Sequence, residues 1–221
     1  MKRNIDYSLY LVTDRGLMSV PAIEESVESA IKGGCALVQL REKSASSREF
    51  YEAALSVKAV TDRYNVPLII NDRLDVALAA GAAGVHIGQS DIPAAAVRRV
   101  AGPEMILGVS ASCLAEALAA SEAGADYIGA GAMFATGTKS DAEITSMDEL
   151  RKIRAAVNIP IVVIGGINMR TIPLFEGTGI DGFAVVSAII GAPDIEQAAK
   201  EMKDKTAGAL RPRTPHKGYH P

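Results

Sequence analysis

Short apolar runs alternate with longer amphipathic segments along nearly the whole chain. The runs are β-branched or leucine-rich and lie at Leu9–Thr13, Leu37–Leu40, Leu68–Ile70, Gly84–Ile87, Ile106–Val109, Tyr127–Gly129, Ile161–Ile164 and Phe183–Val186. The segments between them place apolar residues at helical spacing and usually end in glycine, as helix C-termini prefer. Runs without polar alternation predict strands buried on both faces, which is typical of parallel strands joined by helical crossovers.

Eight strand–helix units within 221 residues predict an α/β fold, a single (β/α)8 TIM barrel. A doubly wound open sheet is the alternative, although no Gly-x-Gly-x-x-Gly follows the first expected strand, which weakens its dinucleotide-binding form. The alanine-glycine doublets at 79–84 indicate a tight connection from helix to strand. We expect one domain over residues 1–210 and a flexible tail over residues 211–221, which carry three prolines.

The composition is that of an ordinary globular protein, with 48% hydrophobic residues and a net charge of -3. This slight acidity argues against nucleic-acid binding, which usually needs a basic surface. We find neither a signal peptide nor an apolar stretch long enough to cross a membrane, so we expect a cytoplasmic protein with no membrane partner. Cys35 and Cys113 form no C-x-x-C pair, and we expect both to be small core residues. Whether the chain forms a homo-oligomer is left open.

Polar residues follow the expected strands, where a (β/α)8 barrel places its active site. After the second strand, the alternate spacing of Gln39, Arg41 and Lys43 directs all three side chains to one side. The polar residues that follow the later strands are Asn71, Asp72, Gln89, Asp91, Ser110, Thr136, Thr138, Lys139 and Ser187, with a Gly-Gly pair at 165–166. Side chains at the ends of parallel strands meet at one rim, so we expect these residues to converge.

These residue types indicate a site for phosphates and a metal ion. Asp72 and Asp91 are the minimum expected of a magnesium site that also uses substrate phosphates as ligands. Arg41, Lys43 and Lys139 supply positive charge for phosphate oxygens. Gly166 and Ser187 predict a second anion site made partly of backbone N–H groups. Two phosphorylated substrates or one bisphosphate would satisfy this pattern.

The motifs LYLVTD, VQLREK, IINDR, GVHIGQSD, GVS, F-x-T-x-T-K, IGGIN and VVSAI occur in this order. Between about Leu9 and Ile189 the chain therefore resembles bacterial thiamine-phosphate synthase. The resemblance implies a (β/α)8 transferase that joins 4-amino-2-methyl-5-(diphosphooxymethyl)pyrimidine to 4-methyl-5-(2-phosphooxyethyl)thiazole. The products are thiamine phosphate and pyrophosphate, the cofactor is Mg²⁺, and the displacement is dissociative, so no side-chain nucleophile is needed.

The resemblance also implies a role for each matching residue. Those expected to contact the pyrimidine diphosphate are Gln39, Arg41, Lys43, Asn71, Ser110 and Lys139. The catalytic candidates among them are Arg41, Lys43, Ser110 and Lys139. Asp72 and Asp91 would hold the magnesium ion. The thiazole phosphate site would be formed by Thr136, Gly137, Thr138, Gly166, Val186 and Ser187.

Two positions depart from the family pattern, because Ala132 and Ala135 stand where prolines are usual. Without them the loop should be looser and substrate affinity lower. We expect His86 to be a hydrogen-bonded barrel histidine and not an acid–base catalyst, and Asp14 to be a structural neighbour of the site. Two other functions stay open: a thiazole tautomerase, which needs no diphosphate or magnesium site, and a non-catalytic phosphate-binding regulator.

Overall fold

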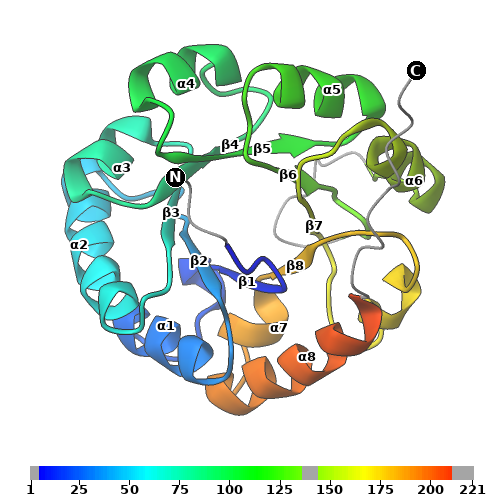
Figure 1. Cartoon of the computed structure of the whole chain (residues 1–221). Helices are drawn as coiled ribbons and strands as arrows, with labels where there is room; N and C mark the ends of the chain where they lie inside the picture. Colours follow the sequence, from blue (N-terminus) through cyan, green and yellow to red (C-terminus); the bar gives the residue numbers. More distant parts are fainter. Residues whose placement is uncertain (1–4, 136–143, 211–221) are drawn as a thin grey trace.

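The computed structural model describes residues 5–135 and 144–210. Its strands form one closed barrel in which every neighbouring pair is parallel and β1 pairs with β8 (Figure 1). They are β1 Leu9–Val12, β2 Leu37–Leu40, β3 Leu68–Asn71, β4 Gly84–Ile87, β5 Ile106–Ala111, β6 Tyr127–Ala130, β7 Ile161–Val163 and β8 Gly182–Val185. The predicted (β/α)8 barrel is confirmed and the open sheet is excluded. The expected tail lies outside the described residues.

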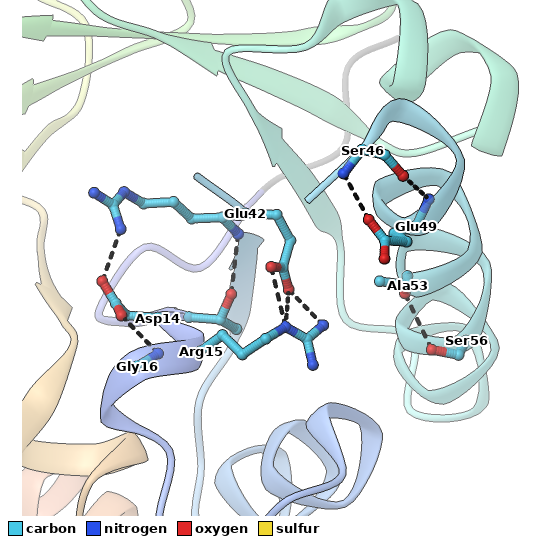
Figure 2. A network of polar contacts seen from close by, with 10 residues as sticks. Asp14, Arg15, Gly16, Glu42, Ser46, Glu49, Ala53 and Ser56 are labelled. Carbon is cyan, nitrogen blue, oxygen red and sulfur yellow. Dashed lines mark hydrogen bonds and ion pairs between the residues drawn. The ribbon is translucent and has the colours of Figure 1, made fainter. Parts of the chain in front are cut away.

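Helices surround the barrel on its outer side (Figure 1). They are α1 Ile23–Lys32, α2 Ser47–Arg63, α3 Leu74–Ala80, α4 Ala94–Ala101, α5 Leu114–Glu122, α6 Met147–Ala156, α7 Ser187–Ile190 and α8 Ile195–Ala209, with the short 3₁₀ helices η1 Arg15–Leu17 and η2 Ile172–Phe175. Capping by nearby side chains fixes where several of these helices begin. At α2, the Ser46 side chain accepts a hydrogen bond from the backbone N–H of Glu49, and the Glu49 side chain accepts one from the backbone N–H of Ser46 (Figure 2).

The expected helix between β7 and β8 is the one clear error in the predicted element order. Within the described residues, η2 is the only helical segment there. Pro173 lies in its first turn and can donate no backbone hydrogen bond. Gly177 and Gly179 then adopt left-handed backbone conformations, both with φ 77°, so the chain turns into β8 instead of continuing a helix.

Strand ends also differ slightly from the expected ones, and one difference matters for the site. Ser110 lies within β5, where it pairs with Gly129 of β6, and is not a loop residue. Val186 lies outside β8 and is the residue from which α7 begins. Because Ser110 is part of the sheet, its side chain is directed by the strand and not by a loop.

The apolar side chains form two separate layers. The larger one lies between the strands and the helices and includes Cys35, which is buried as expected. Cys113 is only half-buried and immediately precedes α5. The smaller layer fills the inside of the barrel and includes Tyr10 and Tyr127, both almost fully buried. Two phenol hydroxyls therefore lie where a small barrel normally carries aliphatic side chains.

Two arginine–aspartate pairs tie outer helices to the strand starts, away from the rim. Arg98 of α4 contacts Asp126 at 2.7 Å, and Asp126 accepts from Leu107 N of β5. Arg154 of α6 contacts Asp181 at 3.0 Å, and Asp181 accepts from Ile161 N of β7. Polar contacts at this end of a (β/α)8 barrel contribute to stability rather than catalysis. No helix among the described residues is long and apolar enough to cross a membrane.

Helices α1 and α8 approach each other closely at Gly33. A Cβ added there would lie 2.3 Å from the carbonyl oxygen of Glu196 and 2.6 Å from the Cβ of Ala199. We predict that Gly33→Ala lowers the free energy of unfolding by about 1–3 kcal/mol, because the helices would have to move apart.

Urea denaturation measures this change, and Gly208→Ala is the matched control. Gly208 lies in α8 with nothing within 4 Å of an added Cβ. Alanine there should be neutral or stabilise by up to about 1 kcal/mol, because alanine favours helix. Equal destabilisation by both substitutions would contradict the close contact at Gly33.

Candidate active site

A cavity of about 880 Å³ opens where the strands end, and residues from every strand or its following loop line it. Every predicted site residue that the structure describes is among them: Gln39, Arg41, Lys43, Asn71, Asp72, Asp91, Ser110, Gly166, Val186 and Ser187. The predicted residues Thr136, Gly137, Thr138 and Lys139 lie outside the described residues. The structure therefore brings these ten residues to one cavity, and their roles stay predictions.

Two ion pairs of opposite polarity hold the loop after β1 against the loop after β2. Arg41 Nη1 lies 2.7 Å from Asp14 Oδ2. Arg15 Nη2 lies 2.6 Å from Glu42 Oε1 (Figure 2). The Glu42 side chain is only 3% exposed, although Arg15 is half exposed. The backbone N–H of Arg41 also donates to Thr13 Oγ1 at 3.0 Å. Arg41 is thus held at the cavity by Asp14, a contact that agrees with the structural role expected of Asp14.

Asp72 and Asp91 approach each other at the rim. Burial raises the pKa of Asp72, and the neighbouring Asp91 raises this pKa further, while Lys43 and Arg41 oppose the shift. Lys43 Nζ lies 3.6 Å from Asp72 Oδ2, and Asp91 Oδ2 accepts from Gly88 N at 2.7 Å. Two carboxylates placed this close repel each other in their ionised forms, so the site favours a cation between or beside them.

The backbone at Asp72 is itself unusual. Its φ is 63°, a left-handed conformation that aspartate tolerates better than most residues. The Asp72 N–H donates to the carbonyl oxygen of His86 at 2.8 Å, which ties the end of β3 to β4. Strained backbone of this kind is concentrated at functional sites, where the surrounding structure holds it.

A hydrogen-bonded chain of five side chains forms the floor of the cavity. Gln39 Nε2 donates to Tyr10 Oη at 2.7 Å, and Tyr10 Oη lies 2.8 Å from Tyr127 Oη. Tyr127 Oη lies 2.9 Å from His86 Nδ1, and His86 Nε2 lies 2.9 Å from Ser110 Oγ. His86 is thus the hydrogen-bonded barrel histidine that the sequence predicts. We call this set the floor network.

Sequence reasoning missed Tyr10 and Tyr127. Both lie inside apolar strands and not after them, so the strand-end criterion passes over them. Their signal was two tyrosines in positions that a small barrel usually fills with aliphatic residues. Only the closure of the sheet brings β1 and β6 face to face, with 6.0 Å between the two ring centroids.

On the opposite side of the cavity the backbones of two loops pack together. Met133 N donates to Ile164 O at 2.9 Å, linking the loop after β6 to the end of β7. Gly166 has φ 68°, and a Cβ there would lie 2.7 Å from the Cβ of Phe134. Asn168 Nδ2 donates to the Gly166 carbonyl at 2.9 Å and fixes the turn. Glycine at 166 is therefore required by both conformation and space.

The first of the two alanines that replace the family's prolines lies in this same loop. Ala132 is buried, and its carbonyl accepts from Thr145 N at 2.8 Å. The expected loss of rigidity and of substrate affinity stays a prediction, since it depends on the loop that continues beyond Ala135.

Comparison with known proteins agrees with this geometry. A family model described as thiamine monophosphate synthase matches residues 9–189. This chain belongs to the thiamine monophosphate synthase family. It is 63% identical over 205 residues to a thiamine-phosphate synthase of Clostridium beijerinckii, covering 93% of this chain and 98% of that relative. A relative of the same name from Clostridium botulinum is 60% identical over 205 residues, with 93% and 96% covered.

A solved structure supports the same assignment. The thiamine phosphate pyrophosphorylase from Pyrococcus furiosus is 40% identical to this chain and matches it with a TM-score of 0.86. The match covers 93% of this chain and 98% of that one. The thiamine monophosphate synthase family is therefore supported by sequence and by fold over nearly the same residues.

The repulsion between the two rim carboxylates generates a prediction. Asp72→Asn removes one charge but keeps a side chain that tolerates left-handed backbone. In EDTA we expect the variant to be more stable than the parent by on the order of 1 kcal/mol. That gain raises the melting temperature by about 2–4 °C. The lost contact with Lys43 is exposed and long, so it offsets little of this gain.

Thermal unfolding with and without Mg²⁺ checks the prediction. Mg²⁺ should raise the melting temperature of the parent but not of Asp72→Asn, because a bound ion stabilises only a state that holds it. Asp62→Asn, an exposed carboxylate on α2, is the control for a simple change in net charge. A Mg²⁺ response in Asp72→Asn equal to that of the parent would contradict the assignment of the metal to Asp72.

Proposed function

We propose that this cavity is the active site in which the enzyme, a transferase of the thiamine-phosphate synthase family, performs a Mg²⁺-dependent condensation. It joins 4-amino-2-methyl-5-(diphosphooxymethyl)pyrimidine to 4-methyl-5-(2-phosphooxyethyl)thiazole and releases pyrophosphate. The observation that carries the proposal is the meeting of Arg41 and Lys43 with the paired carboxylates Asp72 and Asp91 at one rim. Positive side chains beside a metal-binding pair suit a departing diphosphate.

The pyrimidine diphosphate occupies the half of the cavity next to β2, β3 and β5. Arg41 binds its phosphate oxygens and can grip two at once, while Lys43 acts as a point charge. Asn71, Ser110 and Gln39 line the same half and provide neutral hydrogen-bonding groups. Lys139, which lies outside the described residues, is proposed to contact the same diphosphate.

Asp72 and Asp91 are the residues that would hold Mg²⁺. The donor set fits, because magnesium is usually bound through one or two carboxylates with substrate phosphates and water as its other ligands. Among the described residues no group of three or more His, Cys, Asp or Glu side chains is placed to hold a metal ion. When bound, the ion neutralises charge on the leaving diphosphate.

The thiazole phosphate occupies the other half, against the loops after β7 and β8. Gly166, Val186 and Ser187 line that half. Close packing requires glycine at 166, so no side chain separates the backbone there from an anion. The Ser187 hydroxyl adds a hydrogen-bond donor. Thr136, Gly137 and Thr138 are proposed to complete this site from outside the described residues.

The reaction breaks the CH₂–O bond of the pyrimidine and forms a C–N bond to the thiazole nitrogen. Pyrophosphate takes the electron pair of the broken bond, and the electron-rich aminopyrimidine stabilises the cation. No side chain has to attack, so the protein's work is to hold the two substrates in line and to stabilise the leaving charge. A cavity of about 880 Å³ has the size usual for small-molecule sites.

Two other functions fit the fold less well. A thiazole tautomerase acts on one phosphate and has no use for Arg41, Lys43 and two rim carboxylates. A non-catalytic regulator has no need for a metal pair that repels itself without an ion. The named relatives, which match over nearly the full chain, also favour the synthase.

The deciding experiment supplies the purified protein with both substrates and Mg²⁺ and measures thiamine phosphate and pyrophosphate. We expect both products in equal amounts and none when EDTA replaces Mg²⁺. Conversion of the thiazole phosphate alone would indicate the tautomerase. Binding of both ligands without any product would indicate the regulator.

The division of the cavity generates a separate prediction. Ser187→Ala removes one hydroxyl from the proposed thiazole phosphate site and should raise the KM for the thiazole phosphate about tenfold. The KM for the pyrimidine diphosphate should stay nearly unchanged. Initial rates with each substrate varied in turn provide the measurement. A rise confined to the pyrimidine diphosphate would mean that the two anion sites are exchanged.

A further inference from the structure

The floor network is closed off from solvent along most of its length. Tyr10 is 1% exposed and Tyr127 is fully buried. Burial raises the pKa of both phenols, so each keeps its proton at neutral pH. A buried hydroxyl proton needs an acceptor, because leaving it unpaired is costly. Each proton in the network can therefore be followed to its acceptor.

The path begins at Gln39, whose Nε2 donates to Tyr10 Oη. Among the hydrogen bonds of the described residues, the proton of Tyr10 then has Tyr127 Oη as its acceptor. Tyr127, having accepted, gives its own proton to His86 Nδ1. A neutral imidazole that accepts at Nδ1 carries its proton on Nε2, which donates to Ser110 Oγ. Ser110 lines the cavity, so its hydroxyl proton is then available to a ligand there.

The two ends of the path are consequently linked. If the amide of Gln39 were turned over, Oε1 would accept from Tyr10 and every later bond would reverse. Ser110 would then donate to His86 and offer only lone pairs to the cavity. In the first arrangement, Gln39 offers an acceptor to the cavity and Ser110 offers a donor. In the reversed arrangement, Gln39 offers a donor and Ser110 offers an acceptor.

Close packing holds the rings of the network in place. A Cβ on Gly108 would lie 2.2 Å from Tyr127 Cζ and 2.4 Å from His86 Nδ1. A Cβ on Gly129 would lie 2.9 Å from His86 Cε1. The rings of Tyr127 and His86 fill the space that Gly108 and Gly129 leave, so a side chain at either glycine would displace them. The packed barrel thus fixes the positions of the rings, while the donation from Gln39 Nε2 sets the direction of the hydrogen bonds.

We propose that Tyr10, Tyr127 and His86 are positioning residues that set what the cavity floor offers to the pyrimidine diphosphate. Gln39 presents its Oε1 as an acceptor, which suits an N–H of the 4-amino group, and Ser110 presents its hydroxyl proton to an acceptor atom of the same ligand. The identity of this ligand rests on the proposed function; the direction of the network does not. Groups oriented in advance need no rearrangement when the substrate reacts.

The first test observes the imidazole directly and is independent of catalysis. In ¹⁵N-labelled protein at neutral pH, NMR distinguishes a protonated ring nitrogen from an unprotonated one. We expect His86 to carry its proton on Nε2, with its signals identified by their loss in His86→Gln. A proton on Nδ1, or on both nitrogens, would overturn the proposal whatever the enzyme's activity.

The second test compares two substitutions of His86. The longer glutamine side chain can place an amide N–H near the former Nε2 and donate to Ser110. Asparagine reaches only the former Nδ1. We expect His86→Asn to raise the KM for the pyrimidine diphosphate about tenfold, the factor of one lost hydrogen bond, with the KM for the thiazole phosphate unchanged. His86→Gln should recover most of that loss.

Tyr127→Phe provides a second break in the network if either histidine variant folds poorly, because it removes one hydroxyl and keeps the ring. It should show the same selective rise in KM. Equal losses for glutamine and asparagine, or a rise in both KM values, would overturn the positioning role. If the parent itself makes no thiamine phosphate, the proposed function fails, while the NMR result still decides the direction of the network.

Discussion

Closure of a parallel sheet into a barrel is the constraint on which this protein's chemistry depends. Because every strand runs in the same direction, all eight end at one rim, and residues far apart in the sequence meet there. The strands themselves are buried on both faces, so charge can accumulate only beyond their ends. Arg41 and Lys43 after β2 face Asp72 after β3 and Asp91 after β4 for this reason alone.

The charges at that rim are not fully compensated, because the carboxylates of Asp72 and Asp91 lie close together. Burial and the neighbouring Asp91 raise the pKa of Asp72, while Asp14 forms an ion pair with Arg41. Without a bound ion, a protein with two such carboxylates is less stable than one with a neutral side chain in place of either. In the function proposed above, it would gain stability when a divalent ion and an anionic substrate enter, which is the usual exchange of stability for function.

The interior of the barrel contributes a different kind of order. Ions at the rim act over distance and tolerate small displacements, whereas Tyr10, Tyr127 and His86 act through directional hydrogen bonds within a packed layer. In the proposed function, the rim would provide charge for the substrate phosphates, and the floor network would orient the pyrimidine ring. Glycines at 108 and 129 make room for the floor, which links the function of the site to the packing of the sheet.

Hydrophobic periodicity alone was sufficient to predict the barrel, and the residues after each strand were sufficient to predict most of the rim. Both signals are patterns among residues that are neighbours in the sequence. The same reasoning placed a helix before β8 where Pro173 and two glycines allow only η2, and it passed over Tyr10 and Tyr127. Partners from different strands or their following loops, such as Arg41 with Asp14 or Tyr10 with Tyr127, are separated by 27 and 117 positions. Contacts of that kind follow from closure of the sheet, and no local sequence pattern predicts them. Only the tertiary structure therefore decides which polar groups meet and in which direction they donate.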